Sequence, residues 1–549
     1  MPKTLRSRFL WAIPAALSLA LGAPAAAQAP VPAPPAAEFT AEQWREDLRF
    51  MAAEMARRHA NLYHSISREQ FAAAVDDLDA RIPTLQRNQI IVGMMRIAAM
   101  VGDGHTRVDP RKDAKFGFRS LPLKLYLFED GLYVRAAAPA QAGLVGAKVE
   151  AIGGVPVAEA IRRAAEISSR DNEVGPKLFV PLYLGMPDIL HALGLGNRRD
   201  AAELKLRKGR RVWTATVPAA QVDPVWPPDT DISLVTPEGW VDARTAPQPL
   251  WLRAPLDYHR MIDLPDRRAL YVQLNMVTDT REQSLARFGE RIEERVRQIN
   301  PRAVVLDLRL NQGGNGNLRT GLVRALIRAE DADTRLYVLT WRGTFSASQF
   351  IMDDLDRLTD AVFLGEPASS KPSSFGDAYR MPMPNSGVTV RSSIYYWQEG
   401  QNRDPWTWVD VATPLTLADY AAGRDPALEA ALAYAPPPPL HERLAVSGDV
   451  RAALDAYRSD PANRYANQAL HVPRAAELLW NSGHQPEALA TAFYAAEHFP
   501  NNVDAWNVLA HLAEAAEQTN VARRAGARVL ALDPDSRTAR ALLERLPPS

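Results

Sequence analysis

The 549-residue sequence contains no cysteine. This absence excludes disulfides, cysteine nucleophiles, thiolate metal sites and a lipid anchor on an N-terminal cysteine. The chain also lacks an excess of either charge, because 64 Lys and Arg residues balance 64 Asp and Glu residues. Such a balance gives no electrostatic reason to expect nucleic acid or an anionic membrane as a partner. His-Glu-x-x-His does not occur and the ten histidines are scattered, so we expect no metal and no other cofactor.

Long apolar runs are also missing, apart from one at the N-terminus. Residues 9–21 are apolar, interrupted only by Pro14 and Ser18, and follow a short basic segment. The run is shorter than the roughly 20 residues that a membrane span requires, which disfavours a membrane anchor. We therefore expect residues 1–27 to be an export signal, cleaved near Ala27, and the protein to be periplasmic. Residues 28–38 are rich in Pro and Ala and are expected to form a disordered leader.

Hydrophobic periodicity divides the remaining chain into four parts and predicts a multi-domain α+β protein. Residues 39–115 have the apolar spacing of helices and end in the turn-rich segment 102–106. Residues 116–250 contain short strands and a helical insert, and their Gly-Leu loop before a strand resembles a PDZ domain. Residues 440–549 are Ala-rich and helical, with similar residues 34 apart, and resemble tetratricopeptide repeats. This tail is either a helical cap or a binding site for a protein partner.

Residues 251–435 alternate strand and helix, which predicts an α/β core with crossover connections. Thr280 and Gln283 are expected to form a capping box at the start of one helix. The apolar strand 303–308 is expected to be buried on both faces and leads into the glycine-rich loop 311–317. Such loops suit a phosphate or a developing oxyanion, because glycine lets backbone N–H groups approach a ligand closely.

Residues 343–349 are a second candidate catalytic segment. They lie where a strand is expected to end and a helix to begin, and they include Ser346. Serine at this position is commonly an N-cap. However, the N–H groups and partial positive charge of a helix N-terminus also stabilise an alkoxide and a tetrahedral intermediate.

Taken together, four segments resemble the tail-specific protease and tricorn-core family of serine peptidases. These are Asp-x-Arg-x-Asn-x-Gly-Gly at 307–314, Ser-Ala-Ser-Gln at 346–349, Gly-Glu-Pro at 365–367 and Gly-Asp-Gly-His-Thr at 102–106. The resemblance covers residues 41 to about 435 and implies a crotonase-like core. It implies that Ser346 is the nucleophile, that Gly314 and Ala347 N–H groups form the oxyanion hole, and that cleavage occurs near C-termini of protein or peptide substrates. Ser348 is the nearest competitor but should face elsewhere.

Two residues remain open as the general base. The resemblance offers Lys371, as in a Ser–Lys dyad, or His105, as in tricorn-like members. A lysine base must fall from a pKa of about 10.4 to about 7–8, whereas histidine needs almost no shift. Lys371 occupies a polar Ser/Pro loop and His105 a glycine turn between domains, which favours His105. Asp404 is a candidate for orienting the base.

The sequence thus predicts a serine-type peptidase, and two other functions remain open. One is a catalytically inactive peptide- or lipophile-binding protein, because a retinoid carrier shares the family's fold. The other is an esterase that uses the same serine.

Overall fold

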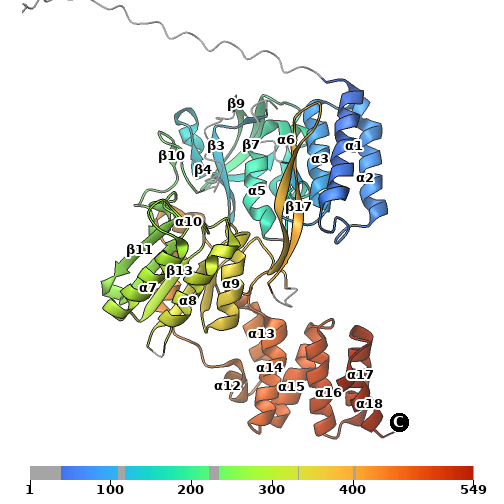
Figure 1. Ribbon diagram of the computed structural model, residues 1–549, viewed down its shortest axis with the longest axis vertical. Coiled ribbons are helices and arrows are strands. Elements are labelled where there is room, and N and C mark those ends of the chain that lie inside the picture. The colour runs from blue at the N-terminus through green and yellow to red at the C-terminus, as the bar shows by residue number, and fades with distance from the viewer. Residues whose placement is uncertain (1–38, 109–117, 222–233, 332, 400–403, 548–549) are drawn as a thin grey trace, which may run out of the picture. The chain divides into compact units, whose positions relative to one another are not determined.

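The computed structural model describes residues 39–108, 118–221, 234–331, 333–399 and 404–547 (Figure 1). The predicted export signal and leader lie outside these residues. No described helix has both the length and the apolar composition that a membrane span demands.

Three helices open the described chain: α1 (Ala41–Arg58), α2 (Arg68–Arg81) and α3 (Arg87–Met100). α1 begins at Ala41 because Thr40 and Gln43 form a reciprocal capping box, which satisfies two N–H groups of the first turn. Trp44, Leu48 and Met51 on one face of α1 are buried, as their spacing predicts. α3 ends just before the loop that carries His105.

The next part of the chain forms a seven-stranded sheet with the order β10-β4-β5-β7-β8, in which β3 pairs with β4 and β6 with β5. Three helices, α4, α5 and α6, separate β6 from β7 in the chain. The strands are β3 (Leu123–Phe128), β4 (Gly131–Ala137), β5 (Lys148–Ile152), β6 (Val155–Pro156), β7 (Ala201–Lys208), β8 (Arg211–Pro218) and β10 (Val241–Asp242); the helices are α4 (Val157–Ala165), α5 (Gly175–Leu184) and α6 (Pro187–Ala192). A small pair, β2 (Arg119–Ser120) and β9 (Ala220–Gln221), lies outside this sheet.

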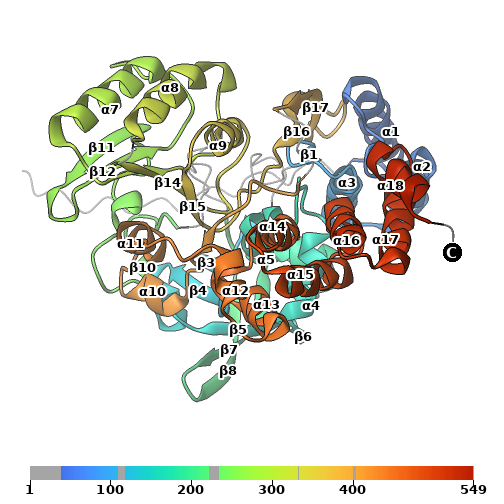
Figure 2. The same cartoon turned by 90° about the horizontal axis from the view of Figure 1, so that it is seen from below.

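The core that carries Ser346 is a six-stranded sheet with the order β11-β12-β13-β14-β15-β18. β11 is antiparallel to β12, and the other pairs are parallel, as the alternation of strands and helices predicts. Figure 2 shows α7 and α8 on one side of this sheet and α11 on the other, and both faces are packed. The elements are β11 (His259–Leu264), β12 (Ala269–Leu274), α7 (Leu285–Ile299), β13 (Ala303–Asp307), α8 (Arg319–Ala329), β14 (Arg335–Thr340), α9 (Ala347–Leu358), β15 (Val362–Gly365), β18 (Val411–Ala412), α10 (Leu417–Ala421) and α11 (Pro426–Ala433).

One predicted helix start is wrong. Ser284 caps α7, because its side chain accepts the Arg287 N–H. Thr280 instead closes a turn before the helix, where its hydroxyl accepts the Gln283 N–H at 3.2 Å. The capping box predicted at Thr280 therefore does not form.

A long hairpin joins this core to the N-terminal helices. β16 (Ser373–Pro382) and β17 (Thr389–Gln398) pair in antiparallel fashion, and β17 also pairs with the short strand β1 (Arg107–Val108). Because β1 follows His105 by two residues, this pairing ties the His105 loop to the core. Figure 1 shows β17 running between the core and the N-terminal helices.

The C-terminal tail consists of helices that share one apolar core. Ala488 and Ala522, the residues 34 positions apart, are both fully buried in it. The helices are α12 (Leu440–Ala445), α13 (Val450–Ser459), α14 (Gln468–Asn481), α15 (Gln485–His498), α16 (Val503–Ala515), α17 (Thr519–Leu532) and α18 (Arg537–Arg545).

Candidate active site

Ser346 occupies a strained turn between β14 and α9. Its φ is 57° and its ψ is −127°, a conformation that costs a non-glycine residue about 1–3 kcal/mol. Two hydrogen bonds hold the turn: the Ser346 N–H donates to Ser370 Oγ at 2.8 Å, and the Phe345 N–H donates to the Asn311 carbonyl at 3.0 Å. The Ser346 side chain does not cap α9, so the N-cap alternative does not apply. Its hydroxyl is therefore available for another partner.

That partner is His105. Its Nε2 lies 3.1 Å from Ser346 Oγ, although the two residues are 241 positions apart in the chain. The imidazole also stacks on the ring of Phe345, with the centroids 4.4 Å apart. A base must accept the serine proton at Nε2, so the ring proton must then be on Nδ1. Nδ1 is buried, and no acceptor meets hydrogen-bond geometry with it among the described residues.

A buried carboxylate, Asp103, shapes the loop that presents His105. Its Oδ1 accepts the His105 N–H at 2.8 Å and the Thr106 N–H at 2.7 Å. Its Oδ2 contacts His59 Nε2 at 2.8 Å, and the Asn61 N–H donates to His59 Nδ1, so Nε2 must carry the His59 proton. Burial alone would raise the pKa of Asp103, but the bonds from His59 and Thr106 lower it to about 2. Asp103 is thus ionised, and its hydrogen bonds fix the loop that carries His105. This role was not predicted from the sequence.

The electrostatics of the site keep His105 neutral. Burial lowers the pKa of His105 to about 4 by disfavouring the charged imidazolium. The negative charges of Asp103 and Asp377 and the backbone of Phe375 act in the opposite direction, and Arg107 adds to the lowering. At neutral pH the imidazole is therefore free to accept a proton, and the two nearby carboxylates favour the cation that would result.

The glycine loop after β13 packs directly against the Ser346 turn. A Cβ atom placed on Gly313 would lie 2.6 Å from Ser346 Cβ and 2.9 Å from the Ala347 nitrogen, and φ of Gly313 is +109°. The Gly313 carbonyl and the Asn315 N–H are both bonded to Val277, which fixes the loop. The N–H groups of Gly314 and Ala347 bond to no acceptor in the described chain. Two N–H groups without an acceptor are one requirement of an oxyanion hole, so the predicted roles of Gly314 and Ala347 stay open to test.

A methyl group at Gly313 is therefore expected to disable the site. We expect Gly313→Ala to slow the labelling of Ser346 by a fluorophosphonate about 100-fold or more, because the added carbon displaces the Ser346 turn. Gly196→Ala is the matched control, since no atom lies within 4 Å of a Cβ at that position. Equal labelling rates of the two variants would show that the loop does not shape the site.

Most other residues of the motifs stabilise the loops. Arg309 forms buried ion pairs with Asp307 and Asp425, at 2.6 Å and 2.7 Å. Ser348 is fully buried, and its hydroxyl donates to the carbonyls of Phe345 and Asn311. These bonds support the turn from within the core.

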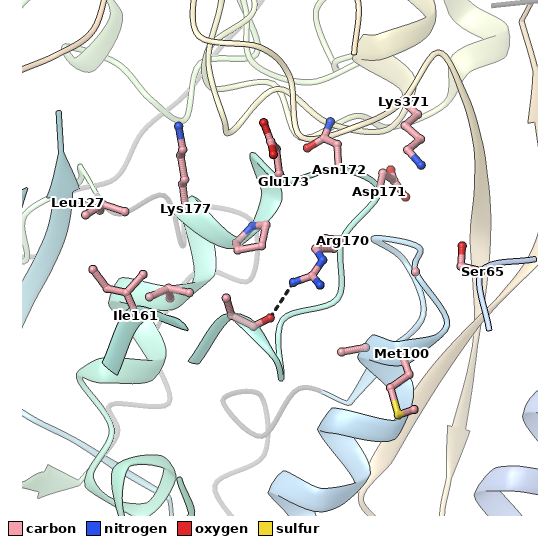
Figure 3. Close-up of a pocket in the computed structure, with 15 residues that line it drawn as sticks. Ser65, Met100, Leu127, Ile161, Arg170, Asp171, Asn172, Glu173, Lys177 and Lys371 are labelled. Atoms are coloured by element: carbon pink, nitrogen blue, oxygen red, sulfur yellow. Dashed lines mark hydrogen bonds between the residues drawn. The ribbon is translucent and has the colours of Figure 1, made fainter. Parts of the chain in front are cut away.

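The other two predicted site residues lie elsewhere. No hydrogen bond joins Lys371 to Ser346 in the described chain; its side chain lines a cavity and its ammonium end points toward Asp171 (Figure 3). Asp404 accepts a hydrogen bond from the Trp408 indole at 2.6 Å. Asp103, Arg107 and Asp377 are the charged groups with the largest effects on the pKa of His105, and the orienting role of Asp404 stays a prediction.

One group of side chains has the spacing of metal ligands. His59, His64 and Asp103 present nitrogen and oxygen atoms within 4.8 Å of one another. The His59 Nε2 proton and Asp103 already form a hydrogen bond, so we interpret the group as structural. The described site offers the chemistry of a serine hydroxyl, an imidazole and free N–H groups.

Comparison with known proteins gives likenesses of structure alone. No protein-family model and no curated protein matches the sequence. Mature CPAF in complex with lactacystin is similar to this structure, with 12% identity, a TM-score of 0.48, and coverage of 69% of this chain and 95% of that one. The photosystem II D1 C-terminal processing protease aligns with 15% identity and a TM-score of 0.34, over 71% of this chain and 99% of that one. The tricorn protease aligns with 12% identity and a TM-score of 0.30, over 71% of this chain and 36% of its own. At these identities and TM-scores we assign the chemistry of this chain from its own residues.

Proposed function

We propose that the protein is a serine peptidase in which Ser346 is the nucleophile and His105 the general base. The observation that carries the proposal is the 3.1 Å contact between His105 Nε2 and Ser346 Oγ. Hydrogen-bond reach between nucleophile and base is the first requirement of this chemistry. The strained backbone of Ser346 adds support, because strain of this kind is concentrated at functional sites.

The reaction would proceed in two halves. As Ser346 Oγ bonds to the scissile carbonyl carbon, its proton passes to His105 Nε2, and the Gly314 and Ala347 N–H groups bind the oxyanion. The C–N bond then breaks, and the imidazolium returns the proton to the leaving amine. Water next attacks the acyl-enzyme, giving one proton to His105, and the acid product leaves as the serine recovers its hydrogen. No cofactor takes part.

Lys371 is not the base in this proposal. A lysine base needs an apolar site that removes its charge, whereas the Lys371 side chain lies in a cavity beside Arg170, Asp171 and Glu173. Its charge acts on Asp171, whose pKa it lowers. Lys371 therefore fits an electrostatic role near the site.

Three further parts of the proposal rest on the sequence. The resemblance to tail-specific proteases suggests cleavage near the C-terminus of protein or peptide substrates. The basic and apolar N-terminal segment suggests export to the periplasm. The helical tail suggests a binding surface for a protein partner, with packing against the rest of the chain as the alternative.

Incubation of the full mature protein with a peptide mixture and with small p-nitrophenyl esters tests the activity. We expect peptide cleavage, with the cut sites read by mass spectrometry. Turnover of esters without peptides would identify an esterase. A protein that cleaves neither substrate and takes up no fluorophosphonate would be the inactive binding protein, and the proposal would be wrong.

A further inference from the structure

Asp171 is a buried acid that touches the loop of the proposed base. It lies between α4 and α5 and is only 5% exposed. Its Oδ1 accepts the Gly104 N–H at 2.7 Å, and Gly104 immediately precedes His105. A Cβ at Gly104 would lie 2.8 Å from the Phe345 ring and 3.4 Å from Asp171 Cγ. Gly104 therefore packs closely between Asp171 and Phe345, the residue before Ser346.

Asn172, the residue after Asp171, bonds to the loop that contains Ala368 and Ser370. Asn172 Nδ2 donates to the carbonyls of Ala368 and Ser370, at 2.9 Å and 3.2 Å. Ser370 Oγ in turn accepts the Ser346 N–H at 2.8 Å. The Ser370 hydroxyl also lies close enough to lower the pKa of Asp171. One short segment therefore contacts both the His105 loop and the loop that fixes Ser346.

The second carboxylate oxygen of Asp171 is not satisfied. Oδ2 is buried and has no partner with hydrogen-bond geometry in the part of the chain that the structure describes. The acid lines a cavity of about 730 Å³ (Figure 3). The charged groups around it are Arg170, Glu173, Lys177 and Lys371 in the cavity, and Asp103 behind Gly104.

These surroundings let the acid change its charge near neutral pH. Burial, aided by the charge of Asp103, raises the pKa of Asp171 to about 7. The Gly104 N–H, Lys371 and Ser370 act in the opposite direction without cancelling the effect of burial. Both the ionised and the protonated form of the Asp171 carboxyl group are thus populated near neutral pH.

We propose that Asp171 is a positioning residue of the Ser346–His105 pair: its ionised carboxylate aligns the His105 loop with the Ser346 turn, and protonation weakens that alignment. An ionised carboxylate only accepts hydrogen bonds, so it can accept both the Gly104 N–H and the Ser370 O–H. Ser370 Oγ then keeps a lone pair for the Ser346 N–H. A protonated carboxyl has lost the charge that strengthens these bonds, and if its O–H donates to Ser370, the Ser370 hydrogen must turn away to another acceptor.

Asp171→Asn in the full chain tests this inference, which rests on the proposed function. The asparagine carbonyl can still accept the Gly104 N–H, but the side chain cannot carry charge. For the wild type we expect kcat to rise with pH through about 7. In Asp171→Asn that rise should vanish, and kcat at pH 8 should fall about ten- to a hundredfold with little change in KM, because small misplacements of reacting groups cost this much.

Glu173→Gln is the matched control. Glu173 is an exposed acid of the same segment and lines the same cavity, and no hydrogen bond joins it to Gly104 or Ser370 in the described chain. Its replacement removes one negative charge and should leave the rise near pH 7 in place. If Asp171→Asn also keeps that rise, Asp171 does not position the pair. If Asp171→Asn fails to fold, Ser370→Ala breaks the same connection from the other side and should also abolish the rise.

Melting temperature measures the titration of Asp171 without catalysis. A carboxyl with a raised pKa binds its proton more tightly in the folded state, so wild-type stability falls as pH rises from about 4 to about 7. The melting temperature of Asp171→Asn relative to wild type should therefore rise between pH 5 and pH 8. A rise in this difference with an unchanged kcat profile would overturn the positioning role. A wild type with neither turnover nor labelling of Ser346 would instead refute the proposed function, and this inference with it.

Discussion

Ser346→Ala is expected to lower kcat for peptide hydrolysis by about four to six orders of magnitude. Alanine removes the only atom that can form the acyl-enzyme, while the glycine loop and His105 remain in place. A residual rate above that of water should survive, because the N–H groups of Gly314 and Ala347 can still stabilise an oxyanion formed by water attack. Labelling by a fluorophosphonate, which needs the hydroxyl, should disappear altogether.

Ser348→Ala is the control for this prediction. Its hydroxyl is buried two residues further along and bonds only to backbone groups of the turn in the described chain. Loss of these bonds should cost about 1–3 kcal/mol of stability and leave the hydroxyl of Ser346 in place. Labelling that survives in Ser346→Ala and disappears in Ser348→Ala would identify Ser348 as the nucleophile and refute the assignment.

The local part of this site could be predicted from the sequence. The buried run of β13, the paired glycines and the serine at the start of α9 lie within about fifty residues of one another. Each element is specified by its own short segment, so the strand, the loop and the helix start were all predicted. The strained φ of Ser346 was not predicted, because the bonds that hold the turn come from Ser370 and Asn311, which lie outside residues 343–349.

The long-range part could not be predicted. The hairpin β16–β17, which ties β1 and the His105 loop to the core, was missed because its strands lack a clear apolar alternation: Tyr379, Tyr395 and Tyr396 on it are exposed. Asp171 sits in a polar stretch that is typical of a solvated loop. Its hydrogen-bond partner Gly104 lies 67 positions away, and Ala368, a partner of Asn172, lies 196 positions away. Nothing in the local sequence encodes such contacts.

The second large expected effect is a loss of kcat/KM, and it distinguishes the two candidate bases, His105 and Lys371. His105→Gln should lower kcat/KM by about three to four orders of magnitude, because the amide keeps much of the side-chain volume but cannot take the serine proton. Lys371→Met should cost less than about tenfold, because methionine keeps the length of the side chain and only the charge is lost. Steady-state kinetics on one peptide substrate compares the two variants directly. A Ser–Lys dyad predicts the reverse order, with Lys371→Met inactive and His105→Gln nearly unaffected.

The pH dependence provides an independent check on the same assignment. The base must be neutral, and burial lowers the pKa of His105 to about 4, so activity should rise as pH increases through about 4. Removing the Lys371 charge should leave this rise unchanged. Removing this charge should shift the second rise in activity, near pH 7, to higher pH, because Lys371 lowers the pKa of Asp171. A Lys371→Met profile that shifts at its acid end and not near neutrality would place the lysine beside the base and contradict the roles given to both residues.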